Sequence, residues 1–365
     1  MTIFESMKKM ILFLLVFISA TSFAQTITPL LDFNGFFKNF QNGYFQQIEL
    51  QRIKEFESGD HICAYVDFRG NLIAYDGKSK KQLANLSVEY RVSDELLTWK
   101  IGQTLNMWDK GQIQTLSYNV RNYWVKDNII VFEDMRYNAV SVYFEGRIYT
   151  LYTSMGELEP PISVGENIVA FKDNGDFNKV FWNGQIYELD VWQTPYNFQT
   201  GTDVLAFNDP ISGTFAVFEN GEFLDVEEFH VNKYRSGRGF IVYENRNDDL
   251  VYYKNGEVIQ LTNFGASQWE VKDDVVYWVE NGFTYVYSNG KKIEIARYIP
   301  KEYALKNGVV AYRNIMGGVS ALVDGKVHEI TNQMNSEFEI FGNNVLVKLF
   351  NSSYIVLSNG KNYRI

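Results

Sequence analysis

Residues 268–298 read QWEVKDDVVYWVENGFTYVYSNGKKIEIARY. The stretch divides into a first run, QWEVK, a turn and second run, DDVVYWVEN, a third run, FTYVYS, and a fourth, KKIEIARY. All four are rich in the β-branched and aromatic residues that favour strands. Asn289-Gly290 is a favoured two-residue hairpin connection, since both of its positions adopt positive φ. The stretch therefore predicts four short strands joined by tight turns.

The hairpin glycine recurs along the whole chain at steps of 34 to 38 residues. Its positions are Gly43, Gly77, Gly111, Gly146, Gly184, Gly221, Gly256, Gly290, Gly325 and Gly360. Self-similarity at a fixed period of 20–50 residues is the mark of a repeat architecture. The sequence therefore predicts ten units of about 35 residues.

Large apolar residues keep phase with each glycine. An aromatic residue stands 12 to 14 positions before it, at Tyr65, Trp99, Phe132, Phe171, Phe207, Tyr243, Trp278 and Tyr312. Nine residues earlier comes another large apolar residue, at Phe56, Tyr90, Tyr123, Ile162, Phe198, Tyr234, Trp269 and Tyr303. In the last unit Lys348 takes the place of the first aromatic, and we interpret it as a mark of the seam where a ring closes.

Four-stranded units at this period fit a β-propeller or a β-solenoid. The propeller is favoured, because a solenoid coil does not need an Asn-Gly hairpin in every unit. Radial packing buries both faces of each sheet, and large flat side chains at one register fill the wedge between blades. The predicted fold is all-β, a propeller over residues 25–365 with nine complete units and one partial N-terminal unit. That unit has a third and fourth strand in residues 36–50 and a second strand in residues 28–33.

Propellers usually have 4 to 8 blades, so ten units leave three arrangements open: one wide ring, two fused smaller rings, or an open arc. We expect one ring, because no linker of altered composition interrupts the period. By period and pattern alone, residues 26–365 resemble β-propellers of the general kind that includes the TolB-like proteins.

The N-terminus has the features of a secretory signal peptide. Lys8 and Lys9 precede an apolar run, residues 10–19, and the small residues of ATSFAQ follow. We expect cleavage after Ala24, so residues 1–24 are a leader and the mature protein is periplasmic or secreted. No cysteine follows the cleavage site, so we expect no lipoprotein anchor, and no later run is long enough to span a membrane. The leader's ending resembles signal peptides of Bacteroidota, which implies a bacterial origin.

Charge and cysteine content exclude two classes. The chain carries a formal net charge of −10 without a Lys/Arg cluster, which disfavours nucleic-acid binding. Cys63 is the one cysteine, so the chain has no internal disulfide, and its apolar surroundings predict a buried residue.

No catalytic constellation is visible, and we expect no cofactor, no metal and no enzyme activity. The three histidines, His61, His230 and His328, lie far apart in the sequence, and the usual hydrolase, nucleotide and zinc motifs are absent. The segment DNGD, Asp173–Asp176, has oxygen ligands that suit Ca²⁺, but a plain turn is the preferred interpretation.

Enlarged connections follow the two longest steps of the repeat, between Gly146 and Gly221. Binding residues often lie on loops of a rigid scaffold, so the candidates for a partner-binding site are Glu157, Glu159, Trp192, Glu227 and Glu228. The alternative is that these are simply longer connections.

The sequence thus predicts a non-enzymatic, exported scaffold that binds another protein. One specific candidate is a soluble periplasmic partner of an outer-membrane complex, such as the plug subunit of the type 9 secretion translocon. The alternative is a propeller that binds or cleaves glycans, which would need two converging carboxylates about 5 to 10 Å apart. Acids paired beside aromatic side chains at the channel mouth favour the second function, and a flat face of apolar and polar groups favours the first.

Overall fold

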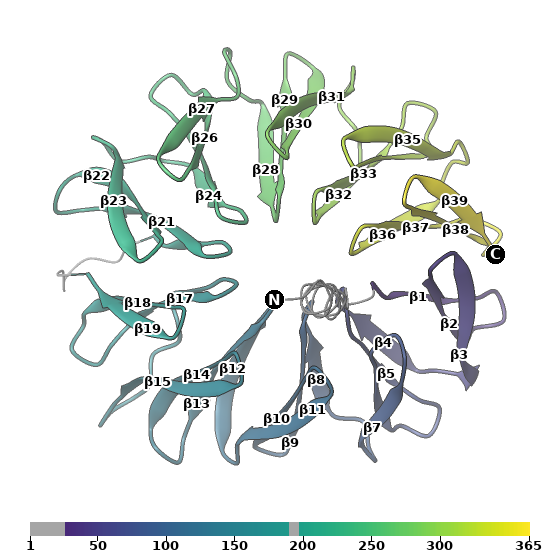
Figure 1. Cartoon of the computed structure of the whole chain (residues 1–365), viewed down its shortest axis with the longest axis horizontal. Helices are drawn as coiled ribbons and strands as arrows, with labels where there is room; N and C mark the ends of the chain where they lie inside the picture. Colours follow the sequence, from purple (N-terminus) through teal and green to yellow (C-terminus); the bar gives the residue numbers. More distant parts are fainter. Residues whose placement is uncertain (1–25, 190–196) are drawn as a thin grey trace, which may run out of the picture.

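The computed structural model describes residues 26–189 and 197–365, and these form ten β-sheets arranged as blades around one closed ring (Figure 1). In each blade the strands follow one another as an antiparallel meander from the centre of the ring to its rim. The prediction of a single ring of ten units is confirmed. The described residues contain no α-helix, and so none with the length and hydropathy that a membrane span requires.

The strands are assigned to blades as follows. Blade 1 has β1 (Thr28–Leu31), β2 (Phe36–Gln41) and β3 (Tyr44–Arg52). Blade 2 has β4 (Glu55–Ser58), β5 (Cys63–Val66), β6 (Leu72–Tyr75) and β7 (Lys80–Ala84). Blade 3 has β8 (Glu89–Val92), β9 (Leu96–Ile101), β10 (Thr104–Asp109) and β11 (Gln112–Ser117). Blade 4 has β12 (Val120–Lys126), β13 (Ile129–Asp134), β14 (Ala139–Phe144) and β15 (Arg147–Thr153). Blade 5 has β16 (Ser163–Val164), β17 (Ile168–Lys172), β18 (Asn178–Trp182) and β19 (Gln185–Glu188). Blade 6 has β20 (Gln199–Thr200), β21 (Val204–Asp209), β22 (Thr214–Glu219) and β23 (Glu222–Glu227). Blade 7 has β24 (Tyr234–Ser236), β25 (Ile241–Glu244), β26 (Leu250–Lys254) and β27 (Glu257–Gln260). Blade 8 has β28 (Gln268–Lys272), β29 (Val275–Glu280), β30 (Phe283–Ser288) and β31 (Lys291–Ala296). Blade 9 has β32 (Tyr303–Lys306), β33 (Val309–Arg313), β34 (Val319–Val323) and β35 (Lys326–Thr331). Blade 10 has β36 (Glu337–Phe341), β37 (Asn344–Lys348), β38 (Tyr354–Ser358) and β39 (Lys361–Arg364).

Blade 1 has three strands within the described residues, and the other nine blades have four. Its β1 corresponds to the second strand of a complete blade, as predicted, because the loop that follows Leu31 matches the loop that follows the second strand elsewhere. The predicted partial unit is therefore confirmed, including its second strand.

The predicted aromatic register lies in the second strand of each blade and forms the core between blades. Trp278, Tyr65, Tyr243, Phe132 and Phe171 are almost completely buried, and each packs in a cluster of apolar residues from neighbouring sheets. The wedge-filling role expected for the aromatics is confirmed.

The interpretation of Lys348 as the last member of that register is wrong. Trp269 pairs with Trp278 in blade 8, and the equivalent pair in blade 10 is Phe338 with Val347. Lys348 is one residue further on and makes an ion pair of 3.0 Å with Glu337. The distance from register to hairpin glycine varies between blades, which led to the displaced assignment. Blade 10 does adjoin blade 1, so the ring seam is where the sequence placed it.

The turns between first and second strands line the centre of the ring and join blade to blade through backbone hydrogen bonds. Glu166 N donates to Gly201 O (3.1 Å), and Thr202 N donates to Gly237 O (3.1 Å). A Cβ built on Gly201 would lie 2.1 Å from Gly237 O, so only glycine fits there. This contact sets how closely neighbouring blades approach at the centre.

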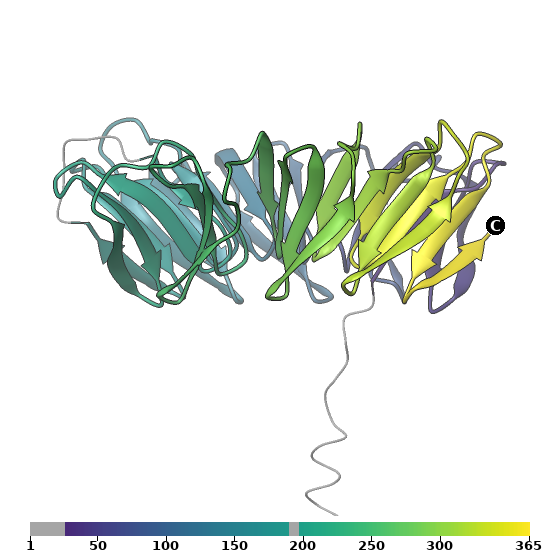
Figure 2. The same cartoon turned by 90° about the horizontal axis from the view of Figure 1, so that it is seen from above.

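The meander places different loops on the two faces of the ring. The loops between second and third strands, and those between the fourth strand and the next blade, lie on one face, which we call the loop face. The innermost turns and the hairpins with the repeated glycine lie on the other, the hairpin face. Figure 2 shows the ring from its side, with loops of uneven height along the loop face at the top.

Candidate docking face

Exposed apolar side chains gather on the loop face. In seven blades the loop between second and third strands carries one at its tip; the residues are Phe33, Phe68, Tyr137, Phe177, Ile211, Ile315 with Met316, and Phe350. The connections to the next blade add Leu86, Tyr118, Met155, Phe264, Ile299 and Met334. We call this set the apolar crown. Phe33 and Phe350 are 77% and 78% exposed, so these rings contribute little to the core.

Several loops that carry the apolar crown are ordered by hydrogen bonds from their backbone N–H groups to an Asp or Asn side chain of the same loop. Asp32 Oδ1 accepts hydrogen bonds from Asn34 N and Phe36 N, both 2.9 Å away, and Phe33 projects from the loop so formed. Asp67, Asp173 and Asn314 organise equivalent loops in blades 2, 5 and 9. Burial acts to raise the pKa of Asp32, but the hydrogen bonds from Phe36 and Lys38 bring it below its usual value. The tips therefore stand on ordered loops, which reduces the entropy lost on binding.

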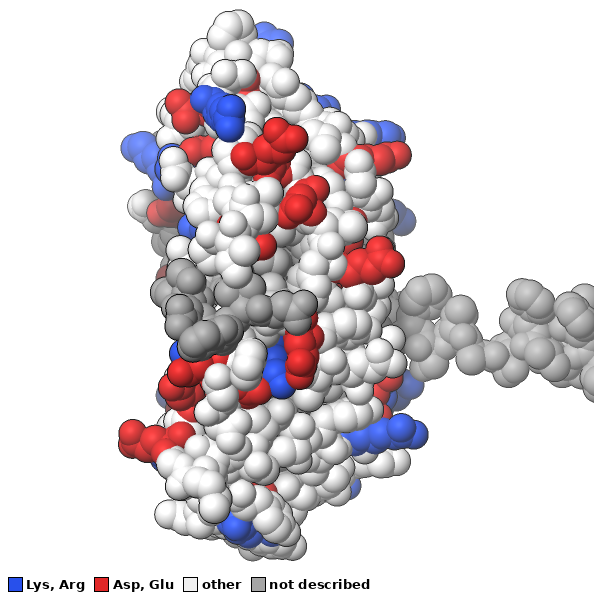
Figure 3. Space-filling model, turned by 90° about the vertical axis from the view of Figure 1, so that its left-hand side faces the viewer, with Lys and Arg blue, Asp and Glu red and all other residues white. Residues whose placement is uncertain are grey.

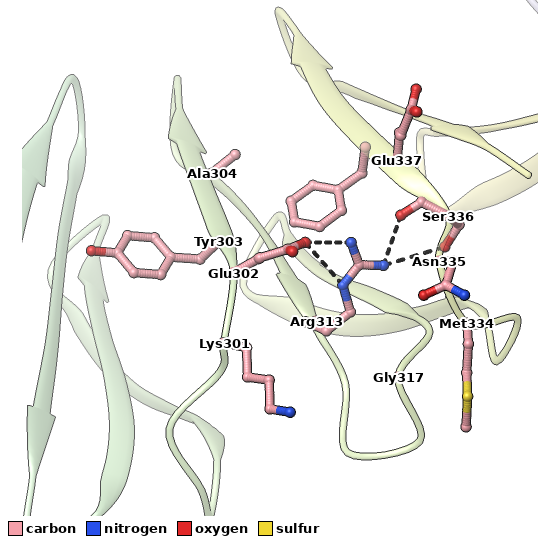
Figure 4. Close-up of a pocket in the computed structure, with 11 residues that line it drawn as sticks. Lys301, Glu302, Tyr303, Ala304, Arg313, Gly317, Met334, Asn335, Ser336 and Glu337 are labelled. Carbon is pink, nitrogen blue, oxygen red and sulfur yellow. Dashed lines mark hydrogen bonds and ion pairs between the residues drawn. The ribbon is translucent and has the colours of Figure 1, made fainter.

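A cleft of about 700 Å³ opens on the loop face between blades 9 and 10 (Figure 4). On its floor Arg313 joins the two blades: its Nε binds Glu302 Oε2 (3.1 Å), and its Nη1 binds Ser336 O (2.7 Å). The guanidinium also lies over the ring of Phe338, 5.1 Å from its centroid. Lys301 and Met334 line the cleft and extend away from this network in Figure 4. Arg313 is thus paired at the floor, and the sides carry the apolar side chain of Met334 and the ammonium of Lys301, for which no ion pair is found among the described residues.

A second cavity, of about 360 Å³, lies next to the first at the seam between blades 10 and 1. Glu337 and Phe338 line both cavities, so the two form one depression along β36. Phe33 and Phe350, on the loops of blades 1 and 10, flank this seam. Crown residues and both cavities thus lie together on this arc of the described loop face.

The predicted candidates that the structure describes lie on the same face but do not form a single site. Glu157 and Glu159 are exposed in the connection from β15 to β16, where the Tyr152 hydroxyl fixes the backbone by donating to Glu159 O (2.7 Å). Glu228 is exposed after β23. Glu227 has a structural role, because it accepts a hydrogen bond from Tyr243 of the next blade (2.6 Å). Trp192 lies outside the described residues.

The DNGD segment is a loop that the chain itself satisfies. Asp173 accepts hydrogen bonds from Gly175 N and Phe177 N and pairs with Lys179 (2.8 Å). Asp176 pairs with Lys172 (2.6 Å). Both carboxylates already pair with lysines, so this segment is better described as a plain turn than as a Ca²⁺ site. Across residues 26–189 and 197–365, no three His, Cys, Asp or Glu side chains are grouped to hold a metal ion.

At the hairpin-face end of the channel, a polar cavity of about 520 Å³ is lined by the innermost turns. Its carboxylates come from Asp60, Asp94, Glu95, Asp127, Glu166 and Asp274, and Arg238 supplies a cation. Burial raises the pKa of Asp127 to about 7, and the neighbouring carboxylates of Asp94 and Glu166 add to this. Apart from the imidazole of His61, the described residues that line this cavity include no aromatic ring.

The crown was missed by reasoning from the sequence, which selected loops by their length. Part of the signal is present in the sequence: the seven loops contain Asp or Asn together with one or two large apolar residues, at positions that differ from loop to loop, as in Asp32-Phe33 and Asn314-Ile315-Met316.

Comparisons with known proteins agree with this architecture. Among curated proteins none matches the sequence. Solved structures with similarity include a computationally designed protein, with 17% identity and a TM-score of 0.32, covering 74% of this chain and 94% of that one. The CRINKLY WD40 ectodomain of an Arabidopsis thaliana receptor kinase shows 11% identity and a TM-score of 0.31, covering 77% of this chain and 96% of that one. The model of the 10-bladed beta propeller domain matches residues 21–363, and the chain belongs to this family.

Proposed function

We propose that the protein is a non-enzymatic scaffold that docks another protein on its loop face. The apolar crown carries this proposal, because soluble proteins rarely repeat large exposed apolar side chains around one face unless that face is covered. Aromatic and Met side chains are also those most enriched at protein interfaces.

The charges favour a protein over a lipid surface. Binding to anionic membranes requires basic residues beside the apolar ones, whereas this chain has a net charge of −10. On the crown, Arg136 pairs with Asp134 (2.9 Å) and Lys179 with Asp173, so these cations are neutralised locally. Figure 3 shows acidic and basic side chains interspersed along the outer wall of the ring, with neutral surface between them.

We propose further that the protein works outside the cytoplasm of a bacterium, after removal of residues 1–24, as a periplasmic partner of an outer-membrane complex. The plug subunit of the type 9 secretion translocon is the specific candidate. Support comes from the signal-like N-terminus, the size of the chain and a wide ring with one contoured face.

The glycan alternative is less well supported. Sugars stack on exposed aromatic side chains beside a carboxylate pair, and the described residues that line the channel cavity include no Phe, Tyr or Trp beside the carboxylates. The aromatics of the loop face stand instead on separate blades.

The test is affinity purification of the tagged chain from detergent-solubilised envelope, with a crown variant that carries Tyr137→Ser, Ile211→Ser and Phe264→Ser. The matched control carries Ile113→Ser, Ile148→Ser and Val258→Ser on the outermost strands, which are also exposed. We expect a protein partner to copurify with wild type and control and to be lost from the crown variant. Recovery of the wild-type protein alone, or equal recovery of the partner with both variants, would contradict the proposal. Binding of the purified chain to glycan arrays would instead favour the alternative.

A further inference from the structure

The innermost position of blade 1 is unfilled within the described residues. β1 pairs on one side with β2, from Thr28 opposite Phe40 to Leu31 opposite Phe37, and no described strand pairs with its other side. Every complete blade has a first strand at this position. β1 therefore presents an open edge of the kind to which an extended segment can add.

The other blades show which side chain such a segment would place opposite β1. The register residue of each second strand stands two positions before the loop that follows it: Tyr312 precedes Asn314, and Tyr243 precedes Asn245. By the same count Leu30, which precedes Asp32, is the register residue of blade 1. In complete blades its partner on the first strand is large, as in the pairs Trp269 with Trp278 and Tyr303 with Tyr312. Leu30 has no such partner among the described residues.

The cavity of about 360 Å³ at the seam lies beside this edge. Its walls are Leu30 and Leu31 of β1, Phe56 on the first strand of blade 2, and Phe338 on the first strand of blade 10. These first strands flank the unfilled place on its two sides. The groove is thus an apolar slot whose dimensions are set by strands that are already in position.

Charge at the groove is acidic. Glu337 and Glu339 of β36 line it, and Lys348 neutralises Glu337. No described ion pair or hydrogen bond engages Glu339, and burial raises the pKa of its carboxyl. A basic side chain on an incoming segment would satisfy this carboxylate.

We propose that blade 1 accepts an extended segment of a partner protein as its fourth strand, with an aromatic side chain opposite Leu30 and a basic side chain near Glu339. This deepens the proposed scaffold function, on which it rests, by giving the chemistry of one contact. Pro29 has no N–H to donate to the new strand. The side-chain slot, more than the backbone ladder, therefore supplies the selectivity.

Two other occupants are outcomes of the test. One is a segment of this chain from before β1. A second copy of the chain is the other.

The probe is a fluorescent peptide with the sequence SQWEVKD, residues 267–273, which contains a first strand of this repeat with its aromatic and basic residues. Its binding to the chain from Gln25 onward is followed by anisotropy, and hydrogen exchange is measured over residues 26–36. We expect saturable binding, with slower exchange confined to β1 and its loop. The peptide with W269G should bind about tenfold more weakly.

Two groove variants and one matched control localise the site. Leu31→Arg blocks the slot, and Glu339→Lys reverses the charge at an exposed position that does not threaten folding. Each should weaken binding about tenfold, whereas Ile315→Arg, on the crown outside the groove, should change it less than about twofold.

Several results would overturn the proposal. One is unchanged peptide affinity in both groove variants. Another is protection of β1 without peptide in the chain from Gln25, which would mean that the edge is already filled. Protection that appears only with the leader present, or only on dimerisation, would assign the slot to a segment from before β1 or to a second copy. None of these results would alter the crown-dependent copurification, so the two proposals fail separately.

Discussion

The carboxylate of Asp60 in blade 2 accepts a hydrogen bond from the backbone N–H of Gly342 in blade 10, 2.9 Å away, across a sequence separation of 282 residues. The same carboxylate pairs with Lys306 of blade 9 (2.6 Å). Blade 1 lies between blades 10 and 2 and lacks a described first strand, so Asp60 bridges the place that this strand would occupy. The two ends of the repeat are thus joined by one side chain near the centre of the ring.

Asp60→Ala should lower the free energy of unfolding by about 2–4 kcal/mol, because it removes a buried acceptor and leaves the ammonium of Lys306 with one carboxylate fewer. Urea denaturation followed by tryptophan fluorescence measures the effect. Asp274→Ala is the matched control, since Asp274 also pairs with a cation, Arg238 (2.7 Å), but is 36% exposed. Equal loss in the two variants would show that Asp60 has no special part in closure.

Gly201→Ala should destabilise the ring by about 1–3 kcal/mol, because its Cβ would overlap Gly237 O and push two blades apart. Gly156→Ala, in an exposed loop where the new methyl group would make only an ordinary contact of 3.9 Å with Ser154 Oγ, should be close to neutral. Thermal unfolding of the two variants compares them directly. Equal midpoints for the two would contradict the close approach of blades 6 and 7.

Asp127→Asn should stabilise the protein above pH 7 and have little effect near pH 4. The folded pKa of Asp127, about 7, lies above the unfolded value of 3.8, so the native state binds more protons than the unfolded state between these values. Stability from this group therefore falls as the pH rises from about 4 to about 7. Denaturation at pH 5 and pH 8 measures the difference, for which we expect about 1–3 kcal/mol at pH 8. A gain of the same size at both pH values would contradict this account.

Cys63 should react with thiol reagents only when the protein unfolds. Its side chain is fully buried, and burial raises the pKa of the thiol, so little thiolate forms at neutral pH. A colourimetric thiol assay in increasing urea should give a labelling midpoint that coincides with the loss of fluorescence. Fast labelling of the native protein would show that blade 2 opens locally.

Phe33→Ser and Phe350→Ser should change the free energy of unfolding by less than about 0.5 kcal/mol each, because both rings are largely exposed. They should also reduce the binding of hydrophobic dyes to the native protein. Destabilisation similar to that of core variants would show that Phe33 and Phe350 pack against the rest of the fold and are not free to contact a partner.

Much of the architecture could be predicted from the sequence, because the repeat is encoded in local chemistry. The glycine at positions such as Gly290 meets a positive-φ requirement that recurs in every hairpin, and the aromatics at positions such as Trp278 meet the same packing requirement in every blade. Lys348 was misplaced because the loops between second and third strands vary in length, so counting back from the glycine gives the register only to within one or two residues. Strand pairing, which depends on the three-dimensional contacts, was needed to place Val347 there.

The apolar crown was not predicted from the sequence, for a physical reason. Glu157 and Glu159 were selected because their loop is long, and Glu227 proved to be a partner of Tyr243. The crown depends instead on single residues such as Phe33, whose exposure follows from the direction in which a short loop projects. The sequence shows that such loops contain apolar residues, but it does not show that the loops of seven blades bring them to one face.

The incomplete blade also bears on orientation. A ring of similar blades offers a circular partner nearly equivalent angular positions, so repeated crown contacts alone would hold it without fixing how it is rotated. Blade 1 interrupts that near-symmetry with a strand edge that no described strand covers and with a cavity beside it. A partner that fills this edge would dock in a single rotational setting, with the ring seam as its reference point.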